Sequence, residues 1–179
     1  MTASIGFVSV RHHCEHGYYG GYLIVNHLAR PLEFHCTLPV KPSRAQEVLY
    51  GPTIDDFICG EQIAKALISK AKIKPDLVIT DSVAALAVVH VSDCVAIKLD
   101  EALSLSKLGD DLRMPESQNR CVVPFTAKGS RFLRSSESHN AEAVAADVLS
   151  KVTDNFDISE PLSRIIDALM EAHPNTKAA

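Results

Sequence analysis

Short runs of apolar, often β-branched residues separated by polar turn residues dominate the first forty positions of the chain. Three strands are predicted from this pattern, over residues 5–10, 22–26 and 32–38. Residues 11–17 are expected to break the first strand, and Gly20 and Gly21 to mark a turn before the second. Because the connections are short, we expect an antiparallel meander.

Beyond this meander, amphipathic stretches alternate with continuous apolar ones. Apolar residues at helical spacing predict a helix over 57–72, and Gly51-Pro52 marks the stretch before it, 42–52, as a connection. The apolar run 77–81 is typical of a strand buried on both faces of a parallel sheet. The remaining expected elements are helices over 82–89, 101–108, 141–152 and 161–172, strands over 94–98 and 121–125, and a polar loop over 109–119.

This order of elements predicts a mixed-sheet α/β fold, in which parallel strands with helices follow the three-strand meander. We expect one α/β domain over residues 1–172, with C-terminal helices packed on it, and a frayed tail over 173–179. Pro124 favours an edge position for the last strand. Ser159 is the expected N-cap of the final helix, with Pro161 in its first turn.

Composition narrows the class of protein. The formal net charge of -4 weighs against a general nucleic-acid binder, which would more often be basic. Five widely and irregularly spaced cysteines without a CxxC pair favour reduced thiols and a cytoplasmic location. The longest apolar stretch, 83–91, is too short to span a bilayer, and no signal peptide is recognisable, so no membrane partner is expected.

Two carboxylates are the first candidates for chemistry. Glu61 lies at the edge of the buried stripe of the helix predicted over 57–72, and Asp81 ends a buried strand at the carboxyl edge of the sheet. Together they would suit Mg²⁺ or Mn²⁺, which take one or two carboxylates plus water and phosphate oxygens. The alternative is that Asp81 only caps the following helix and that Glu61 only borders it.

The N-terminal histidines and cysteines are the second candidates, because imidazole and thiolate are the ligands that zinc prefers. The segment that joins the first two strands contains four of them: His12, His13, Cys14 and His16. No standard ligand spacing occurs, so ordinary loop histidines are the competing interpretation. Cys14 beside three histidines is also a weak candidate for a thiol nucleophile, whereas Cys36, Cys59 and Cys94 are expected to be buried and inert.

A small basic stretch contains Lys128 and Arg131, which could contact a phosphate backbone; a solvated loop is the competing interpretation. No GxxxxGK[ST] or GxGxxG motif is present, so nucleotide binding through either is unsupported.

One family resemblance follows from these residues. Tyr50-Gly-Pro52, Cys59-Gly-Glu61 and Pro75-Asp-Leu-Val-Ile-Thr-Asp81 stand in the order found in endonuclease V, and the strand order resembles the ribonuclease H-like fold. The resemblance covers about the first hundred residues. It implies a nuclease using a metal ion at Glu61 and Asp81, with Lys98 on a lysine-bearing strand, a position for which Lys128 competes. The first strand lacks the aspartate that nucleases of this fold carry there, and Ser82 follows Asp81 where the family has glycine.

Three functions are compatible with this sequence. The favoured one is a non-catalytic module of nuclease-like fold that binds another macromolecule, because the first-strand acid is missing. The second is a divalent-metal-dependent nuclease acting on nucleic acid, and the third is a zinc-stabilised domain. A nuclease predicts Glu61 and Asp81 close enough to share an ion, beside a basic groove wall. A binding module predicts these acids in caps or ion pairs, with an apolar patch exposed elsewhere.

Overall fold

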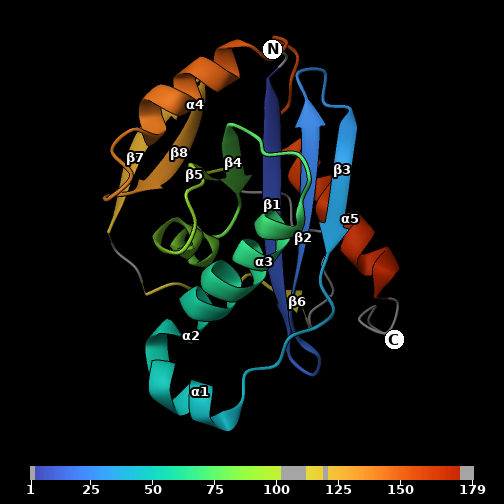
Figure 1. The fold of residues 1–179 in the computed structure, drawn as a ribbon, viewed down its shortest axis with the longest axis vertical. Helices are drawn as coiled ribbons and strands as arrows, with labels where there is room; N and C mark the ends of the chain where they lie inside the picture. Colours follow the sequence, from blue (N-terminus) through green and yellow to red (C-terminus); the bar gives the residue numbers. More distant parts are fainter. Residues whose placement is uncertain (1–2, 102–111, 119–120, 174–179) are drawn as a thin grey trace.

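An eight-stranded mixed sheet forms the centre of the computed structural model, which describes residues 3–101, 112–118 and 121–173. The strand order is β3-β2-β1-β4-β5-β8-β7, and β6 pairs with the far end of β1 (Figure 1). The strands are β1 (Ser4–His13), β2 (Gly17–Asn26), β3 (Pro31–Cys36), β4 (Leu77–Thr80), β5 (Ala96–Leu99), β6 (Leu112–Arg113), β7 (Val122–Ala127) and β8 (Ser130–Ser135). The predicted mixed α/β class is confirmed: β1, β4 and β5 are parallel, and the meander β1-β2-β3 is antiparallel.

The first hairpin is longer than the sequence predicts. β1 continues to His13 and β2 begins at Gly17, so only residues 14–16 connect them. Gly20 and Gly21 were expected in a turn and instead lie inside β2. A side chain would not fit at either position, since a Cβ on Gly20 would lie 2.5 Å from Cγ2 of Ile63 and one on Gly21 2.5 Å from Cγ2 of Ile165. The glycines therefore let helices approach both faces of the strand.

Two apolar cores lie on the two faces of the sheet. One contains residues of α4 (Ala141–Ser150) and α5 (Glu160–Ala172) packed against Phe7, Leu23 and Ile79. The other contains Ile58, Ile63 and Leu67 packed against Val8 and Ile24. The alternation of residues along β1 accounts for this division, because successive side chains of a strand point to opposite faces.

The segment between β3 and β4 is more helical than expected. The predicted connection 42–52 contains α1 (Arg44–Tyr50), which begins at a capping box: Ser43 Oγ accepts the N–H of Gln46, and the Gln46 side chain accepts the N–H of Ser43. The predicted helix 57–72 is observed as the π-helical η2 (Phe57–Ala64) followed by α3 (Lys65–Lys70). Two short elements that were not predicted precede it, η1 (Gly51–Thr53) and α2 (Ile54–Asp56).

The remaining elements depart from the expectations in smaller ways. The helix predicted over 82–89 is the 3₁₀ helix η3 (Ala84–His90). The basic stretch near Lys128 is β8 and its turn, because Lys128 (φ 46°) and Gly129 (φ 80°) reverse the chain into a hairpin with β7. β7 lies at the sheet edge, as Pro124 predicts. Ser159 stands before α5 but its side chain makes no capping bond; it donates to Asp157 instead.

Two expectations lie almost wholly outside the described residues: the helix over 101–108 and the tail after residue 173. The loop over 109–119 is described only over 112–118. Of that loop, Leu112–Arg113 forms β6. Within the described ranges, every helix is too short or too polar to cross a membrane.

Candidate functional site

The carboxyl end of β4 carries a buried ion pair. Asp81 directly follows β4, and Ser9 and Arg11 lie on the neighbouring parallel strand β1, two residues apart and therefore on the same face. Arg11 Nη2 donates to Asp81 Oδ2 over 2.7 Å, and Ser9 Oγ donates to the same oxygen over 2.9 Å. The side chains of Arg11 and Asp81 are only 1 % and 2 % exposed.

The ion pair sits among other buried polar groups. Arg11 Nη1 donates to the carbonyl of Val10 over 2.9 Å and to the sulfur of Met114 over 3.5 Å. Asp81 Oδ1, Arg11 Nε and Ser82 Oγ are buried and have no hydrogen-bond partner among the described residues. A guanidinium at this distance balances the charge of the carboxylate inside the fold, which a carboxylate alone could not sustain there.

Glu61 belongs to a different part of the surface. It is half-buried on η2 and lines a hollow of about 480 Å³ together with Asp56, His90 and Glu137. His90 Nδ1 lies 3.1 Å from Glu137 Oε2. Burial raises the pKa of Asp56, and the negative charges of Asp55 and Glu61 raise it further, against a hydrogen bond from Ser117 that lowers it. Asp81 does not line this hollow.

Gly60 determines where Glu61 lies. A Cβ on Gly60 would be 2.6 Å from Cβ of Ala87 and 2.8 Å from the backbone nitrogen of Val88, so this residue must face η3. Its neighbour Glu61 then stands at the border of the contact between η2 and η3. This half-buried position at the border of a helix contact agrees with the expected edge of the buried stripe, although η2 is π-helical rather than α-helical.

The histidines of the first hairpin make separate contacts. His13 is buried, its Nδ1 accepts the N–H groups of Glu15 and His16, and its ring lies 4.5 Å from the ring of His16. His12 packs on Tyr18 at 4.2 Å between ring centroids and accepts a hydrogen bond from Arg113 Nε over 3.0 Å. Burial lowers the pKa of His12, and the positive charge of Arg113 lowers it further.

His12 and Arg113 line a hollow of about 430 Å³ at this end of the sheet. Lys41, Tyr18 and Cys14 also line it. Beneath it, Tyr18 donates a short hydrogen bond to Asp55, whose other oxygen accepts the N–H of Glu116 over 2.8 Å. Desolvation and this bond raise the pKa of Tyr18. Glu15 and Glu47 also line the hollow, so its lining contains both positive and negative side chains.

The predicted phosphate contacts are engaged within the fold. Lys98 Nζ lies 3.3 Å from Asp100 Oδ1, and Arg131 Nη2 lies 3.3 Å from Asp100 Oδ2. Lys128 Nζ donates to the carbonyls of Leu149, Val152 and Thr153 at 3.3, 2.7 and 2.9 Å. Lys128 therefore binds the C-terminal end of α4, where carbonyls lack helical partners and a cation is favourable.

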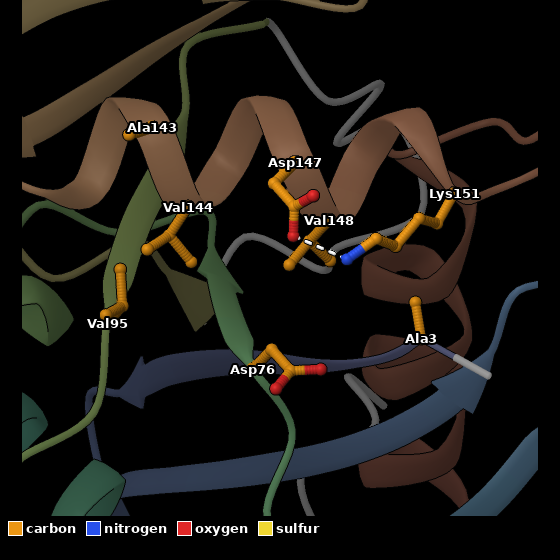
Figure 2. Close-up of a pocket in the computed structure, with 8 residues that line it drawn as sticks. All are labelled: Ala3, Asp76, Val95, Ala143, Val144, Asp147, Val148 and Lys151. Atoms are coloured by element: carbon orange, nitrogen blue, oxygen red, sulfur yellow. Dashed lines mark hydrogen bonds and ion pairs between the residues drawn. The ribbon is translucent and has the colours of Figure 1, made fainter. Parts of the chain in front are cut away.

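A further hollow, of about 560 Å³, lies at the opposite end of the sheet, beside Ala3 and Asp76, which precede β1 and β4. Figure 2 shows Val144 and Val148 of α4 lining it, with the Asp147–Lys151 ion pair of 2.5 Å at its border. Its lining is mostly apolar, and it shares no residue with the hollows that contain Glu61 and His12.

A metal site is not assembled by the part of the chain that the structure describes. Within it, no group of three or more His, Cys, Asp or Glu residues is placed to hold an ion. Glu61 and Asp81 make separate contacts, and so do His12 and His13. The Mg²⁺ and Zn²⁺ sites remain predictions from the sequence. Of the thiols expected to be buried, Cys59 is buried and burial raises its pKa well above the ordinary value, but Cys36 is exposed.

Sequence reasoning missed Arg11 and Ser9. The available signal was their spacing: two polar residues at alternate positions in an otherwise apolar run point to one face of the strand, where a buried partner is needed. The partner itself, seventy positions away, is visible only in the fold.

Comparisons with known proteins give similarities of fold. No family model and no curated protein matches the chain. Solved structures of endonuclease V resemble it. One is the Ciona intestinalis enzyme in complex with a 23mer DNA containing an inosine followed by a ribo-adenosine. It is 10 % identical to this chain, with a TM-score of 0.48, and the match covers 96 % of this chain and 87 % of that one. The catalytic domain of human endonuclease V is 11 % identical with a TM-score of 0.49 over 96 % and 84 %. Another human endonuclease V structure is 12 % identical with a TM-score of 0.44 over 99 % and 87 %. These are structures of the family whose layout the first hundred residues resemble, and identities this low describe a likeness of fold alone.

Proposed function

We propose that this chain is a non-catalytic binding module, in which the Arg11 guanidinium neutralises Asp81 in place of a divalent ion. One observation carries the proposal: Asp81 Oδ2 already accepts hydrogen bonds from Arg11 and Ser9, and the carboxylate is 2 % exposed. A second cation beside the guanidinium would be repelled, since like charges at close range disfavour each other strongly in a buried site.

The charge balance at Asp81 favours an ion pair over a metal site. A metal-dependent phosphate clamp needs carboxylates that are ionised, converging and open to phosphate oxygens. Here the charge of Asp81 is balanced by a protein cation, and Glu61 lies in another hollow. A binding module also predicts exposed apolar side chains away from Asp81. The exposed large apolar side chains of the described residues all lie between Leu28 and Leu49, which supports this interpretation.

Thermal unfolding of the purified protein with and without Mg²⁺ and Mn²⁺ tests the proposal. A ligand that binds the native state raises its stability, so an ion at Asp81 would raise the melting temperature. We expect no metal-dependent rise in the unmodified chain, and none in Glu61→Gln, which leaves the Arg11–Asp81 pair intact. A rise that is lost in both Glu61→Gln and Asp81→Asn would instead establish a shared metal site and contradict the proposal.

A second candidate is a nuclease acting on nucleic acid, and a specific observation favours it. His12, Lys41 and Arg113 line one hollow beyond the carboxyl end of β1, and together they offer donors for a phosphate group and an imidazole for proton transfer. The Nδ1 of His12 accepts from Arg113, which leaves Nε2 as the protonated nitrogen of the neutral ring. This arrangement does not use Asp81.

Binding and cleavage of labelled single- and double-stranded oligonucleotides test this second function. If the hollow binds phosphates, Lys41→Ala and Arg113→Ala should each weaken binding and reduce its dependence on salt, while Lys65→Ala, an exposed lysine on α3, should not. Cleavage that persists in EDTA and is lost in His12→Ala would support a nuclease at this hollow. Cleavage that requires Mg²⁺ would return attention to the carboxylates.

A further inference from the structure

The two edges of the sheet differ in what they expose. β3 is the outermost strand on one side and β7 on the other (Figure 1). The six most exposed large apolar side chains of the described residues all lie between positions 28 and 49: Leu28, Leu32, Phe34, Leu38, Val48 and Leu49. β7 instead carries Pro124, a residue that blocks strand addition. The unprotected edge is therefore that of β3.

The exposed residues of β3 form one row. Leu32, Phe34 and Cys36 occupy alternate positions and are all exposed, with Leu32 at 47 % and Phe34 at 40 %. Phe34 and Cys36 pair in register with Leu23 and Gly21 of β2, so they lie on the face that α5 covers farther inward. Leu38, 80 % exposed, follows at the next alternate position. This row extends the apolar face of the sheet beyond the helix that protects it.

Among the described residues, the backbone of β3 has hydrogen-bonding groups on the same residues that β2 leaves open. The N–H of Thr37 donates to the carbonyl of Gly20 over 2.9 Å. Because antiparallel partners alternate between bonded and non-bonded pairs, His35 and Glu33 also bond to β2, and the N–H and C=O groups of Phe34 and Cys36 point away from the sheet. An added antiparallel strand would satisfy these groups.

The side chains of β3 specify which strand would fit. Glu33 and His35 lie on the opposite face of β3, on either side of Phe34, and carry complementary charge, with Glu33 Oε1 2.6 Å from His35 Nε2. If a second β3 pairs antiparallel with a two-fold axis at Phe34, Glu33 of each strand stands beside His35 of the other. The two Phe34 residues then face each other. Leu32, the extra residue where the register between β2 and β3 shifts, stands near Cys36 of the other strand.

We propose that the β3 edge binds a second copy of this chain, forming a two-fold dimer with a sheet that continues across both molecules. A two-fold contact requires a surface that is complementary to itself, which the order Leu32-Glu33-Phe34-His35-Cys36 provides in antiparallel pairing. The proposal concerns self-association, and it stands whether or not Asp81 or the His12 hollow has the function proposed above.

Sedimentation velocity over about a hundredfold range of protein concentration tests the dimer. We expect a concentration-dependent dimer for the unmodified chain. Phe34→Lys should raise the dimer dissociation constant at least about tenfold, because it places two like charges opposite each other on the axis. Thr126→Lys is the matched control: it adds the same charge at an exposed position of β7 and should leave the dimer unchanged.

The register has its own test. In Leu32→Cys the new thiol would stand beside Cys36 of the second copy, at a strand separation that a disulfide can bridge. Mild oxidation should yield a covalent dimer that is absent when Cys36→Ser is added. A monomer at all concentrations would overturn the proposal, and so would a dimer that persists in Phe34→Lys. A dimer lost only in Leu49→Lys would assign the contact to α1 and overturn it as well.

Discussion

Arg11 and Asp81 lie seventy positions apart in the sequence, and the parallel pairing of β1 with β4 brings their charges to 2.7 Å inside the protein. Neither side chain reaches solvent to a meaningful extent. Two adjacent strands thus present opposite charges on one face at the carboxyl edge of the sheet, where α/β proteins usually place their sites. Because the two charges balance each other inside the protein, each partner of the pair is costly to remove.

Removing one partner of this pair should destabilise the protein strongly. Arg11→Met leaves the Asp81 carboxylate buried without a cation and should lower the free energy of unfolding by about 3–5 kcal/mol. Adding Asp81→Leu removes the orphaned charge, so the double variant should be more stable than Arg11→Met alone. Urea denaturation of the single and double variants measures this. A loss below about 1 kcal/mol in Arg11→Met would show that Asp81 is not charged and buried as described.

The contact between Gly21 and Ile165 leads to a second prediction. A Cβ at position 21 would lie 2.5 Å from Cγ2 of Ile165, so Gly21→Ala must push α5 away from β2. We expect a loss of about 1–3 kcal/mol in the free energy of unfolding, typical of an overpacked core. In a double-mutant cycle with Ile165→Ala, which removes the opposing methyl group, the two losses should sum to more than the loss in the double variant. Additive losses would contradict a direct clash.

The strands that the sequence predicts best are those with many apolar residues in an uninterrupted run. β4 and β5 lie close to their predicted positions, because each buries Val, Ile or Leu in one of the two cores. β3 also lies within its predicted range, although its apolar residues Leu32 and Phe34 are exposed. Gly20 and Gly21 misled the prediction, since glycine marks turns in most sequences but here permits contact with Ile63 and Ile165. Which of the two roles a glycine has depends on neighbours that are distant in sequence.

The candidate site was less predictable for the same reason. Asp81 was identified at the end of a buried strand, but its role depends on Arg11, which no local pattern connects to it. Glu61 was expected at the edge of the buried stripe and is half-buried on η2, but the close approach of Gly60 to Ala87 beside it depends on η3. Two features could have been predicted from the sequence. The capping box of Ser43 and Gln46 marks the start of α1, and Lys128-Gly129 marks the turn before β8.

Glu33 provides a prediction of pH dependence. The backbone N–H groups of Lys72 and Ile73, with a smaller contribution from His35, lower its pKa from an ordinary value of 4.5 to about 2. A lowered pKa means that the folded state favours the carboxylate, so the stabilisation is complete above pH 4.5 and is lost as the pH falls toward 2. The difference in melting temperature between the unmodified chain and Glu33→Gln should therefore shrink as the pH falls through this range.

A matched variant separates this effect from general acid unfolding. Glu47 is exposed on α1 and lies 3.6 Å from Arg44, an exposed ion pair of little energetic value. Glu47→Gln should follow the unmodified chain at every pH. A difference for Glu33→Gln that is constant from pH 6 to pH 3 would show that its carboxylate titrates normally.

Lys128 can be tested for a structural role against the predicted phosphate contact. Its Nζ donates to three carbonyls at the C-terminal end of α4, so Lys128→Met should lower the free energy of unfolding by about 1–3 kcal/mol, the range for hydrogen bonds of charged groups. Methionine has a similar length and a similar backbone preference, so the positive φ of this position affects both residues alike. Arg131→Met, at an exposed side chain in the same hairpin, should cost less than about 0.5 kcal/mol. Unchanged stability of Lys128→Met combined with weaker oligonucleotide binding would contradict the structural role and restore the phosphate contact that the sequence predicts.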